Sequence, residues 1–306
     1  MRVLFAGSPG IALPTLEFVG SSRHDLVGVI SQPAKPVGRK KMLTETPVVT
    51  LARKMGIPVE TPGQSEPIEP IIQLWKPDIA IVFAFGRVIS IKERAAVPLG
   101  WWNVHLSLLP SWRGAAPVPH AIAAGDATTG ITVFRIEEGI DTGPIARSSE
   151  LQIHPDETST TLLSKLGSKA PEVVGDFLED AARDRIALRA QTGVVSLAPK
   201  PSSSVGKINW SLNAVSIERT IRAWSFEPGC FAIREDNEQT VKIIGVGGPQ
   251  SNIDLDPGVL YFHAEGMLVG TGSTPILVTE VQPSGKTVMS AADWLRGLPD
   301  GVTFRV

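Results

Sequence analysis

Short apolar runs alternate with helical patterns over residues 1–184. Strands that alternate with helices form a parallel sheet with helices on its faces, so this part of the chain is predicted to be an α/β domain. Residues 79–85 are apolar at every position, which is typical of a central strand buried on both faces. The strands of this sheet are predicted to begin at Arg2, Leu26, Asp78 and Trp101.

The periodicity then changes twice along the chain. Residues 158–182 place apolar side chains at helical intervals, and Pro171 must begin, kink or break this predicted closing helix. Beyond Asp184 the pattern fades into a stretch rich in proline and serine, which is typical of an exposed connector. We therefore divide the chain into a first domain at 1–184, a linker at 185–204 and a second domain at 205–306.

The second domain is predicted to be mostly β. One helical stretch at residues 213–224 is followed by short β-rich runs, among them 240–246, 258–264 and 275–281. Short strands separated by glycine and proline favour a small β-barrel. The predicted fold class is therefore α/β, with a mostly parallel sheet domain followed by a smaller β-barrel domain.

Composition narrows the class of protein. The 306 residues are 42% hydrophobic and 20% charged, which fits a folded protein and excludes a wholly disordered chain. The single cysteine, Cys230, has no partner for an internal disulfide, and no cysteine–histidine spacing fits a zinc site. No apolar stretch has the length of a signal peptide or membrane span. We expect a cytoplasmic monomer with no metal and no membrane partner.

Candidate catalytic residues lie in the fourth predicted strand, which begins at Trp101. Asn103 and His105 lie two residues apart, so both side chains leave the same face of that strand. Ligand crevices of open α/β sheets lie at the carboxyl ends of strands, which predicts a site here with residues 107–110 as its wall. Asp141, in a glycine-containing turn, is the expected partner of His105. From these residues alone, a structural histidine and a strand-end cap remain an alternative.

Two other chemistries are disfavoured by the local sequence. Ser107 lacks the Gly-x-Ser-x-Gly elbow of a serine nucleophile, so only a binding role is expected for it. Residues 7–10, Gly-Ser-Pro-Gly, lack both the Gly-x-Gly-x-x-Gly spacing and a Gly-Lys-Ser/Thr ending. This segment is predicted to be a strand-to-helix turn and not a phosphate-binding loop.

The wider pattern resembles a known family. Asn-Val-His at 103–105 is followed by Ser-Leu-Leu-Pro at 107–110, Arg-Gly at 113–114 and Asp-Thr-Gly at 141–143. Together these motifs resemble the signature of the 10-formyltetrahydrofolate-dependent formyltransferases. The resemblance implies a Rossmann-like first domain, 10-formyltetrahydrofolate as formyl donor, and Asn103, His105 and Asp141 as catalytic residues. It also implies folate contacts at Ser107, Leu108, Leu109, Pro110, Phe85, Gly86, Arg87 and Ile140, with core packing an equal alternative for Phe85.

The implied reaction is attack of a neutral amine on the formyl carbon, through a tetrahedral intermediate that carries an oxyanion. The Asn103 amide and a protonated His105 are expected to donate hydrogen bonds to this oxyanion. Asp141 is expected to orient His105, to raise its pKa and to accept the proton that the amine loses.

The acceptor amine must be inferred from other segments. Residues 32–41 form a polar loop with no acid before Glu45, and such a run is often a solvated surface loop. Here it resembles the loop that methionyl-tRNA formyltransferases insert toward the acceptor end of tRNA. The expected partner is therefore methionyl initiator tRNA, contacted through the phosphate-binding cations Lys35, Arg39, Lys40 and Lys41.

The second domain supports the same acceptor. Residues 207–212 and 285–290 resemble the C-terminal oligonucleotide-binding (OB-like) domain of those enzymes. The net charge of the chain is −2, and residues 207–306 hold 8 basic against 11 acidic side chains, so RNA contact there needs a one-sided patch. The candidates for this patch are Lys207, Arg222 and Lys286.

The sequence departs from the family pattern at two places, and two alternative functions remain. Residues 225–229 read Ser-Phe-Glu-Pro-Gly where the family commonly has Asn-Pro-Trp-Pro-Gly, and Leu106 stands where a small residue is usual. An amino-sugar nucleotide formyltransferase would share the same three catalytic residues but would bind a nucleotide diphosphate. A folate- or RNA-binding module that lost catalysis is the non-enzyme alternative.

Overall fold

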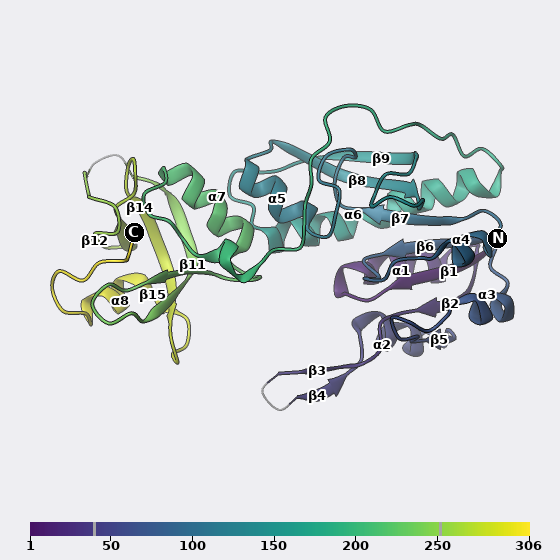
Figure 1. The fold of residues 1–306 in the computed structure, drawn as a ribbon, viewed down its shortest axis with the longest axis horizontal. Coiled ribbons are helices and arrows are strands. Elements are labelled where there is room, and N and C mark those ends of the chain that lie inside the picture. Colours follow the sequence, from purple (N-terminus) through teal and green to yellow (C-terminus); the bar gives the residue numbers. More distant parts are fainter. Residues whose placement is uncertain (39–40, 251–252) are drawn as a thin grey trace. The chain divides into compact units, whose positions relative to one another are not determined.

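A computed structural model describes residues 1–38, 41–250 and 253–306 of the chain (Figure 1). The chain divides into two compact units. The first unit contains residues 1–117, 128–152 and 163–198, and the second contains 118–127, 153–162 and 199–306. The segment expected as a linker, 185–204, is thus divided between the units at residue 198. No helix within the described ranges is long and apolar enough to cross a membrane.

The first unit is built on a seven-stranded sheet with the order β5-β2-β1-β6-β7-β8-β9. The first five of these strands are parallel, whereas β8 and β9 are antiparallel to their neighbours. The expected mostly parallel, Rossmann-like sheet is therefore confirmed. Its strands are β1 (Arg2–Gly7), β2 (Asp25–Ile30), β5 (Val59–Glu60), β6 (Ile79–Phe83), β7 (Trp101–His105), β8 (Thr128–Arg135) and β9 (Ile145–Gln152).

Burial explains why the sequence predicted the middle of this sheet. All five residues of β6 are buried, and β6 is the fourth of the seven strands. On one face, Trp101 belongs to a cluster that includes Trp75. On the other face, the Trp102 ring contacts the Phe177 ring at 4.6 Å between centroids. Residues that are apolar without alternation thus lie where both faces of the sheet are covered.

The helices around this sheet begin at recognisable signals. They are α1 (Leu13–Ser21), preceded by the turn η1 (Gly10–Ala12), α2 (Pro47–Lys54), α3 (Glu69–Trp75), α4 (Ile91–Ala95) and most of α6 (Ser159–Ala182). Helix α5 (Pro117–Ala124) belongs almost wholly to the second unit. Thr46 caps α2 by accepting a hydrogen bond from the Val49 backbone N–H at 3.2 Å. The segment 7–10 leads from β1 into η1, as the sequence predicted. Pro171 lies inside α6, which stays one helix.

The second unit is mostly antiparallel β-structure, as expected. Its sheet has the order β10-β11-β14-β13-β12, with β15 paired to β14. Residues 303–304 form bridges beside both edge strands, since Phe304 pairs with Arg234 and Thr303 pairs with Val259. Residues 303–304 thus contact the chain beside both edges of the sheet, and the expected closure into a β-barrel stays a prediction. The elements are η2 (Ser203–Gly206), α7 (Ala214–Trp224), β10 (Cys230–Ile233), β11 (Thr240–Pro249), β12 (Leu260–His263), β13 (Gly266–Val269), β14 (Ile276–Pro283), β15 (Met289–Ser290) and α8 (Ala291–Arg296).

Aromatic stacking fills the core of this second unit. The Phe304 ring stacks on Trp210 at 5.5 Å and on Trp294 at 5.9 Å between centroids. Cys230 is fully buried at the start of β10, and burial raises the pKa of its thiol to about 12. The thiol is therefore protonated at neutral pH, and it donates a hydrogen bond to the Thr220 carbonyl oxygen at 3.4 Å.

Candidate active site

Strand β7 presents the polar side chains at its carboxyl end. Asn103 is half-buried and lies opposite Val82 of β6 on one side and Phe134 of β8 on the other. His105 is buried and lies opposite Thr132 of β8. Because β6 and β7 are parallel, the loops that follow both strands leave the sheet at the same edge, which is where α/β folds place ligands.

His105 has two polar partners, one on each ring nitrogen. Its Nε2 lies 2.8 Å from the Trp112 carbonyl oxygen, and its Nδ1 lies 3.6 Å from Asp141 Oδ2. A carbonyl oxygen only accepts hydrogen bonds, so Nε2 carries the hydrogen of the neutral ring and Nδ1 faces the carboxylate. Asp141 Oδ2 also accepts a hydrogen bond from the Gly114 backbone N–H at 2.8 Å. The structure thus brings together the histidine and aspartate that the sequence paired.

Burial decides the charge of His105. The pKa of this imidazole is lowered from its usual value chiefly because burial penalises the charged form. The nearby Asp141 carboxylate and the Trp112 carbonyl raise the pKa, but their combined effect is the smaller one. His105 is therefore neutral in the resting protein at pH 7, and the protonated His105 expected to donate to the oxyanion stays a prediction. Nδ1 is free to take up a proton beside Asp141.

Three residues near this strand edge have left-handed backbone conformations. Ala84 follows β6 with φ of 52°, Trp112 follows β7 with φ of 60°, and Asp141 has φ of 51°. Such conformations cost about 1–3 kcal/mol each outside glycine, and they persist where the surrounding structure imposes them. Two of the three residues supply the partners of His105. The sequence gave no signal for Trp112, because its role rests on a backbone carbonyl.

Residues 107–110, the predicted wall of the site after β7, are held by several hydrogen bonds. The Ser107 hydroxyl donates to the Ser111 carbonyl oxygen at 2.5 Å. Thr132 Oγ1 donates to the Ser107 carbonyl oxygen at 2.7 Å and accepts from the Leu109 N–H at 3.2 Å. Leu109 and Pro110 are buried, whereas Leu108 is half-buried. This segment is rigid, and of its four residues Leu108 is the least enclosed.

The other predicted folate residues lie in the loop after β6, except Ile140, which lies in the turn that carries Asp141. Phe85 is buried in the core cluster, so core packing accounts for its side chain. Gly86 is exposed with φ of +75°, and its carbonyl oxygen accepts a hydrogen bond from Gln64 Nε2 at 3.2 Å. Ile140, from the Asp141 turn, is 76% exposed. Gly86 and Ile140 are therefore the accessible members of this set, and their folate contacts stay a prediction.

Arg87 is already engaged by its own loop. Its guanidinium lies 2.6 Å from Glu93 Oε1 and donates to the Gly63 carbonyl oxygen at 2.9 Å, and both charged side chains are more than 90% buried. Glu93 also accepts hydrogen bonds from the Ser90 N–H at 2.7 Å and the Ile68 N–H at 3.2 Å. Arg87 therefore holds the loop after β6. The sequence analysis missed Glu93, although Ser90-x-x-Glu93 has the spacing of a capping box.

The basic segment 32–41 contains a hairpin, which the sequence analysis described only as a loop. Strands β3 (Lys35–Val37) and β4 (Met42–Thr44) pair with each other and form a separate two-stranded sheet that projects from the first unit (Figure 1). Lys35 and Lys41 are exposed on it. Arg39 and Lys40 lie outside the described residues. The hairpin also exposes the apolar side chains of Val37, Met42 and Leu43.

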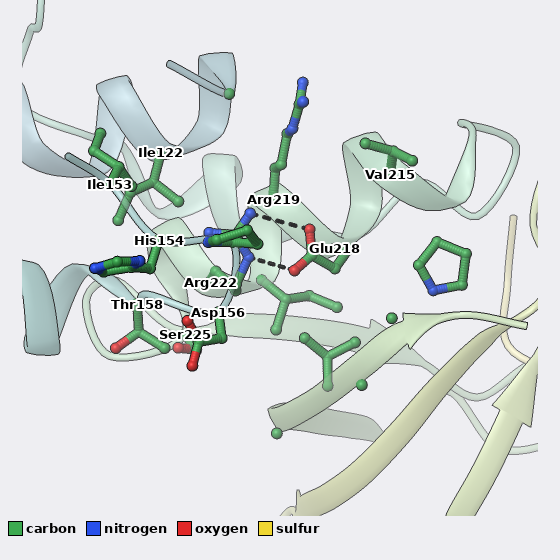
Figure 2. A pocket seen from close by; sticks show the side chains of 18 of the residues that line it. Ile122, Ile153, His154, Asp156, Thr158, Val215, Glu218, Arg219, Arg222 and Ser225 are labelled. Atoms are coloured by element: carbon green, nitrogen blue, oxygen red, sulfur yellow. Dashed lines mark hydrogen bonds and ion pairs between the residues drawn. The ribbon is translucent and has the colours of Figure 1, made fainter. Parts of the chain in front are cut away.

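The three cations predicted in the second unit differ in their surroundings. Lys207 and Lys286 are exposed. Arg222 forms a bidentate pair with Glu218 of the same helix and donates to the Glu157 carbonyl oxygen at 2.8 Å (Figure 2). The charge of Arg222 is thus compensated within the protein. Its contact with RNA stays a prediction and is less favoured than contacts of the two lysines.

The cavity drawn in Figure 2 is not the place of this chemistry. Its lining residues, which include His154, Arg219 and Arg222, all belong to the second unit, whereas Asn103, His105 and Asp141 belong to the first. We locate the candidate site by its convergent polar groups at a strand end. Within the described ranges, no three side chains of the metal-binding types gather in a possible metal site.

Comparison with protein families matches nearly the whole chain. The model described as "Formyl transferase" matches residues 1–177, and "Formyl transferase, C-terminal domain" matches residues 201–299. The methionyl-tRNA formyltransferase of Renibacterium salmoninarum is 38% identical over 307 residues, covering 99% of each chain. The same-named protein of Mycobacteroides abscessus is 40% identical over 302 residues, covering 97% of each chain.

Solved structures share the fold at low sequence identity. WlaRD, a sugar 3N-formyltransferase solved with dTDP and 5-N-formyl-THF, is 20% identical with a TM-score of 0.69, covering 94% of this chain and 99% of that one. Methionyl-tRNA formyltransferase from Clostridium thermocellum is 15% identical with a TM-score of 0.59, covering 84% and 96%. At such identity these likenesses concern the fold alone.

Proposed function

The chain belongs to the formyl transferase family, and from this premise we propose that it transfers the formyl group of 10-formyltetrahydrofolate to the amino group of methionyl initiator tRNA. Relatives with this name match it from end to end at 38–40% identity. The observation that carries the chemistry is the pairing of His105 with Asp141 beside Asn103, at the carboxyl end of β7. The enzyme supports translation initiation, and we propose the cytoplasm as its compartment.

The residues around this strand edge fit a folate formyl donor. Gly86 offers exposed backbone with no atom within 4 Å of the position that a side chain would occupy. Ile140 offers an exposed apolar side chain on the same loop as Asp141. A flat ring with hydrogen-bonding edges needs both kinds of contact, backbone polar groups for its edges and apolar surface for its faces.

Asn103 and His105 divide the work of the transfer. The acceptor nitrogen forms a bond to the formyl carbon, and the carbonyl oxygen becomes an oxyanion until the bond to N10 of the folate breaks. The Asn103 amide donates a hydrogen bond to this oxyanion. Neutral His105 takes the proton that the amine loses at Nδ1, where Asp141 stabilises the resulting imidazolium, and N10 receives this proton as its bond to the formyl carbon breaks. The Trp112 carbonyl keeps its hydrogen bond from Nε2 throughout.

The exposed basic hairpin supports tRNA as the carrier of the amine. Replacing Arg39, Lys40 and Lys41 by alanine is expected to raise the KM for methionyl-tRNA at least about 10-fold, with kcat at saturating tRNA nearly unchanged. Each lost phosphate contact should also reduce the slope of log affinity against log salt by about 0.7 to 0.9. Formylation kinetics across a salt series measure both effects. Lys169→Ala, on the exposed surface of α6, is the matched control, and an unchanged salt slope in the triple variant would reject the hairpin as the tRNA contact.

The alternative acceptor is an amino-sugar nucleotide. Filter binding of labelled methionyl initiator tRNA separates the two classes. We expect the protein to retain the tRNA on the filter and an excess of dTDP-amino sugar to leave that retention unchanged. Failure to retain the tRNA, together with binding of the labelled sugar nucleotide, would overturn the proposed acceptor.

A further inference from the structure

The Gln191 side-chain amide, from the segment that follows α6, connects two loops of the candidate site. Its Oε1 accepts hydrogen bonds from Arg113 Nε at 3.0 Å and Arg113 Nη2 at 2.7 Å. Its Nε2 donates to the Asp141 carbonyl oxygen at 2.8 Å and to the Gly143 carbonyl oxygen at 2.8 Å. Two accepted and two donated bonds use the full hydrogen-bonding capacity of the amide plane.

The partners of this amide permit only one orientation of it. The Arg113 guanidinium has no acceptor, and the two carbonyl oxygens have no hydrogen to donate. A rotation that exchanged Oε1 and Nε2 would therefore break all four bonds. The amide is a fixed bridge between the loop after β7 and the turn that carries Asp141.

The same segment also holds the second partner of His105. Ser196 Oγ accepts a hydrogen bond from the Trp112 N–H at 2.8 Å, and its carbonyl oxygen accepts from the Arg113 N–H at 2.9 Å. Trp112 presents the carbonyl that accepts from His105 Nε2. Both groups that face the His105 ring nitrogens are thus bonded at their backbones to residues 191–196.

We propose that Gln191 is a positioning residue for formyl transfer, which sets the place of the Asp141 carboxylate relative to His105. The inference rests on the proposed function of Asn103, His105 and Asp141. Asp141 has a backbone conformation that costs energy for a residue with a side chain, so its turn needs external bonds to stay in place. Gln191 supplies two of these bonds on the carbonyl side, while the Gly114 N–H holds the carboxylate.

The test uses Gln191→Met, which keeps the side-chain length and adds no charge. We expect kcat for formyl transfer to fall about 10- to 100-fold, because small misplacements of catalytic groups cost up to about 100-fold. The KM for the formyl donor should change less than twofold. Thr192→Ala is the matched control, since Thr192 is the exposed neighbour in the chain and should leave kcat unchanged.

Two further readouts separate positioning from folding. Asp141 is the charged group that raises the pKa of His105, and the ring also lies near the Trp112 carbonyl and the Phe134 ring, opposite the uncharged Thr132 of β8. Displacement of the carboxylate removes its raising effect, so the pKa of His105, followed by imidazole NMR, should fall in Gln191→Met. In a double-mutant cycle, Gln191→Met should cost much less when Asp141→Asn is already present.

The outcomes are distinct from those that concern the acceptor. The NMR pKa needs no acceptor, so it tests Gln191 even if the wild-type protein formylates another amine. An unchanged His105 pKa with an additive cycle would overturn the proposal, as would unchanged kcat in a folded variant. If Gln191→Met does not fold, Gln191→Glu replaces it, since it keeps the bonds from Arg113 and loses both donated bonds. Its kcat should fall to a similar degree, and a wild-type kcat in this variant would equally overturn the role.

Discussion

Asn103→Ala is expected to lower kcat for formyl transfer about 100- to 1000-fold, because loss of one oxyanion donor in a preorganised site has an effect of this size. The KM for either substrate should change far less, since the oxyanion exists only in the transition state and intermediate. Asn103 is only half-buried on β7, so the midpoint of thermal unfolding should stay close to that of the wild type.

Steady-state formylation with methionyl initiator tRNA measures this effect. Asn237→Ala is a matched control, because Asn237 lies in an exposed turn of the second unit, where its side chain accepts from the Gln239 N–H. His105→Ala and Asp141→Ala are likewise expected to lower kcat by orders of magnitude. A kcat within threefold of the wild type in a folded Asn103→Ala protein would remove Asn103 from the mechanism.

Glu93→Ala is expected to lower the free energy of unfolding by about 3–5 kcal/mol, because it leaves Arg87 buried without a counter-charge. The variant also loses the hydrogen bonds that Glu93 accepts from the Ser90 and Ile68 N–H groups. Urea denaturation measures the change. Because the loop after β6 carries Gly86, the KM for the formyl donor should rise as well.

The matched comparison for the buried Arg87–Glu93 pair is a solvent-accessible ion pair with a similar N···O distance. Lys169 and Glu172 lie 2.5 Å apart on α6, where the side chains are 37% and 64% exposed, and Glu172→Ala should cost no more than about 1 kcal/mol. The double variant Arg87→Leu/Glu93→Leu should cost less than Glu93→Ala, because no uncompensated charge remains. Equal losses of stability from Glu93→Ala and Glu172→Ala would contradict the importance assigned to the buried pair.

The pH dependence of kcat/KM tests the charge state of His105. Burial places its pKa below the usual value of 6.5, and the neutral ring is the form that takes the proton from the amine. His105 should therefore contribute an acidic limb below pH 6.5, separate from the limb that deprotonation of the acceptor α-amino group, with a usual pKa of about 7.7–8.0, contributes at higher pH. Asp141→Asn removes a contribution that raises this pKa, so the limb should move to lower pH while the plateau falls. A rate that decreases on passing upward through pH 6.5 would indicate that the imidazolium is the active form.

The sequence predicted the parallel core because its signal is local. The unbroken apolar run in β6 and the strand starts at β1, β2, β6 and β7 follow from burial on both faces, and observed and predicted starts agree within one residue. Antiparallel β9 carried no such signal, because most of its residues are exposed or half-buried. Antiparallel β8 is buried at six consecutive positions, but the sequence analysis did not identify it as a strand.

The candidate site was predictable only in part, for a similar reason. Asn103 and His105 share a strand face, which spacing alone gives, the glycine-containing turn suggested Asp141, and the family pattern added the catalytic role of all three. Trp112 acts through its backbone carbonyl, and Gln191 reaches the site from 50 residues beyond Asp141. Local residue spacing predicts neither a backbone carbonyl as a partner nor a hydrogen bond between residues far apart in the sequence. The Arg87 side chain is held by Glu93, and the folate contact expected of Arg87 from the family pattern stays a prediction.

The measurement that tests the central claim most directly is transfer of labelled formyl from 10-formyltetrahydrofolate by the purified protein. Methionyl initiator tRNA, uncharged initiator tRNA and an amino-sugar nucleotide serve as parallel acceptors. The account predicts label on the methionyl-tRNA alone, released as formylmethionine when the aminoacyl ester is hydrolysed. Label on the sugar nucleotide, or on none of the three acceptors, would contradict it.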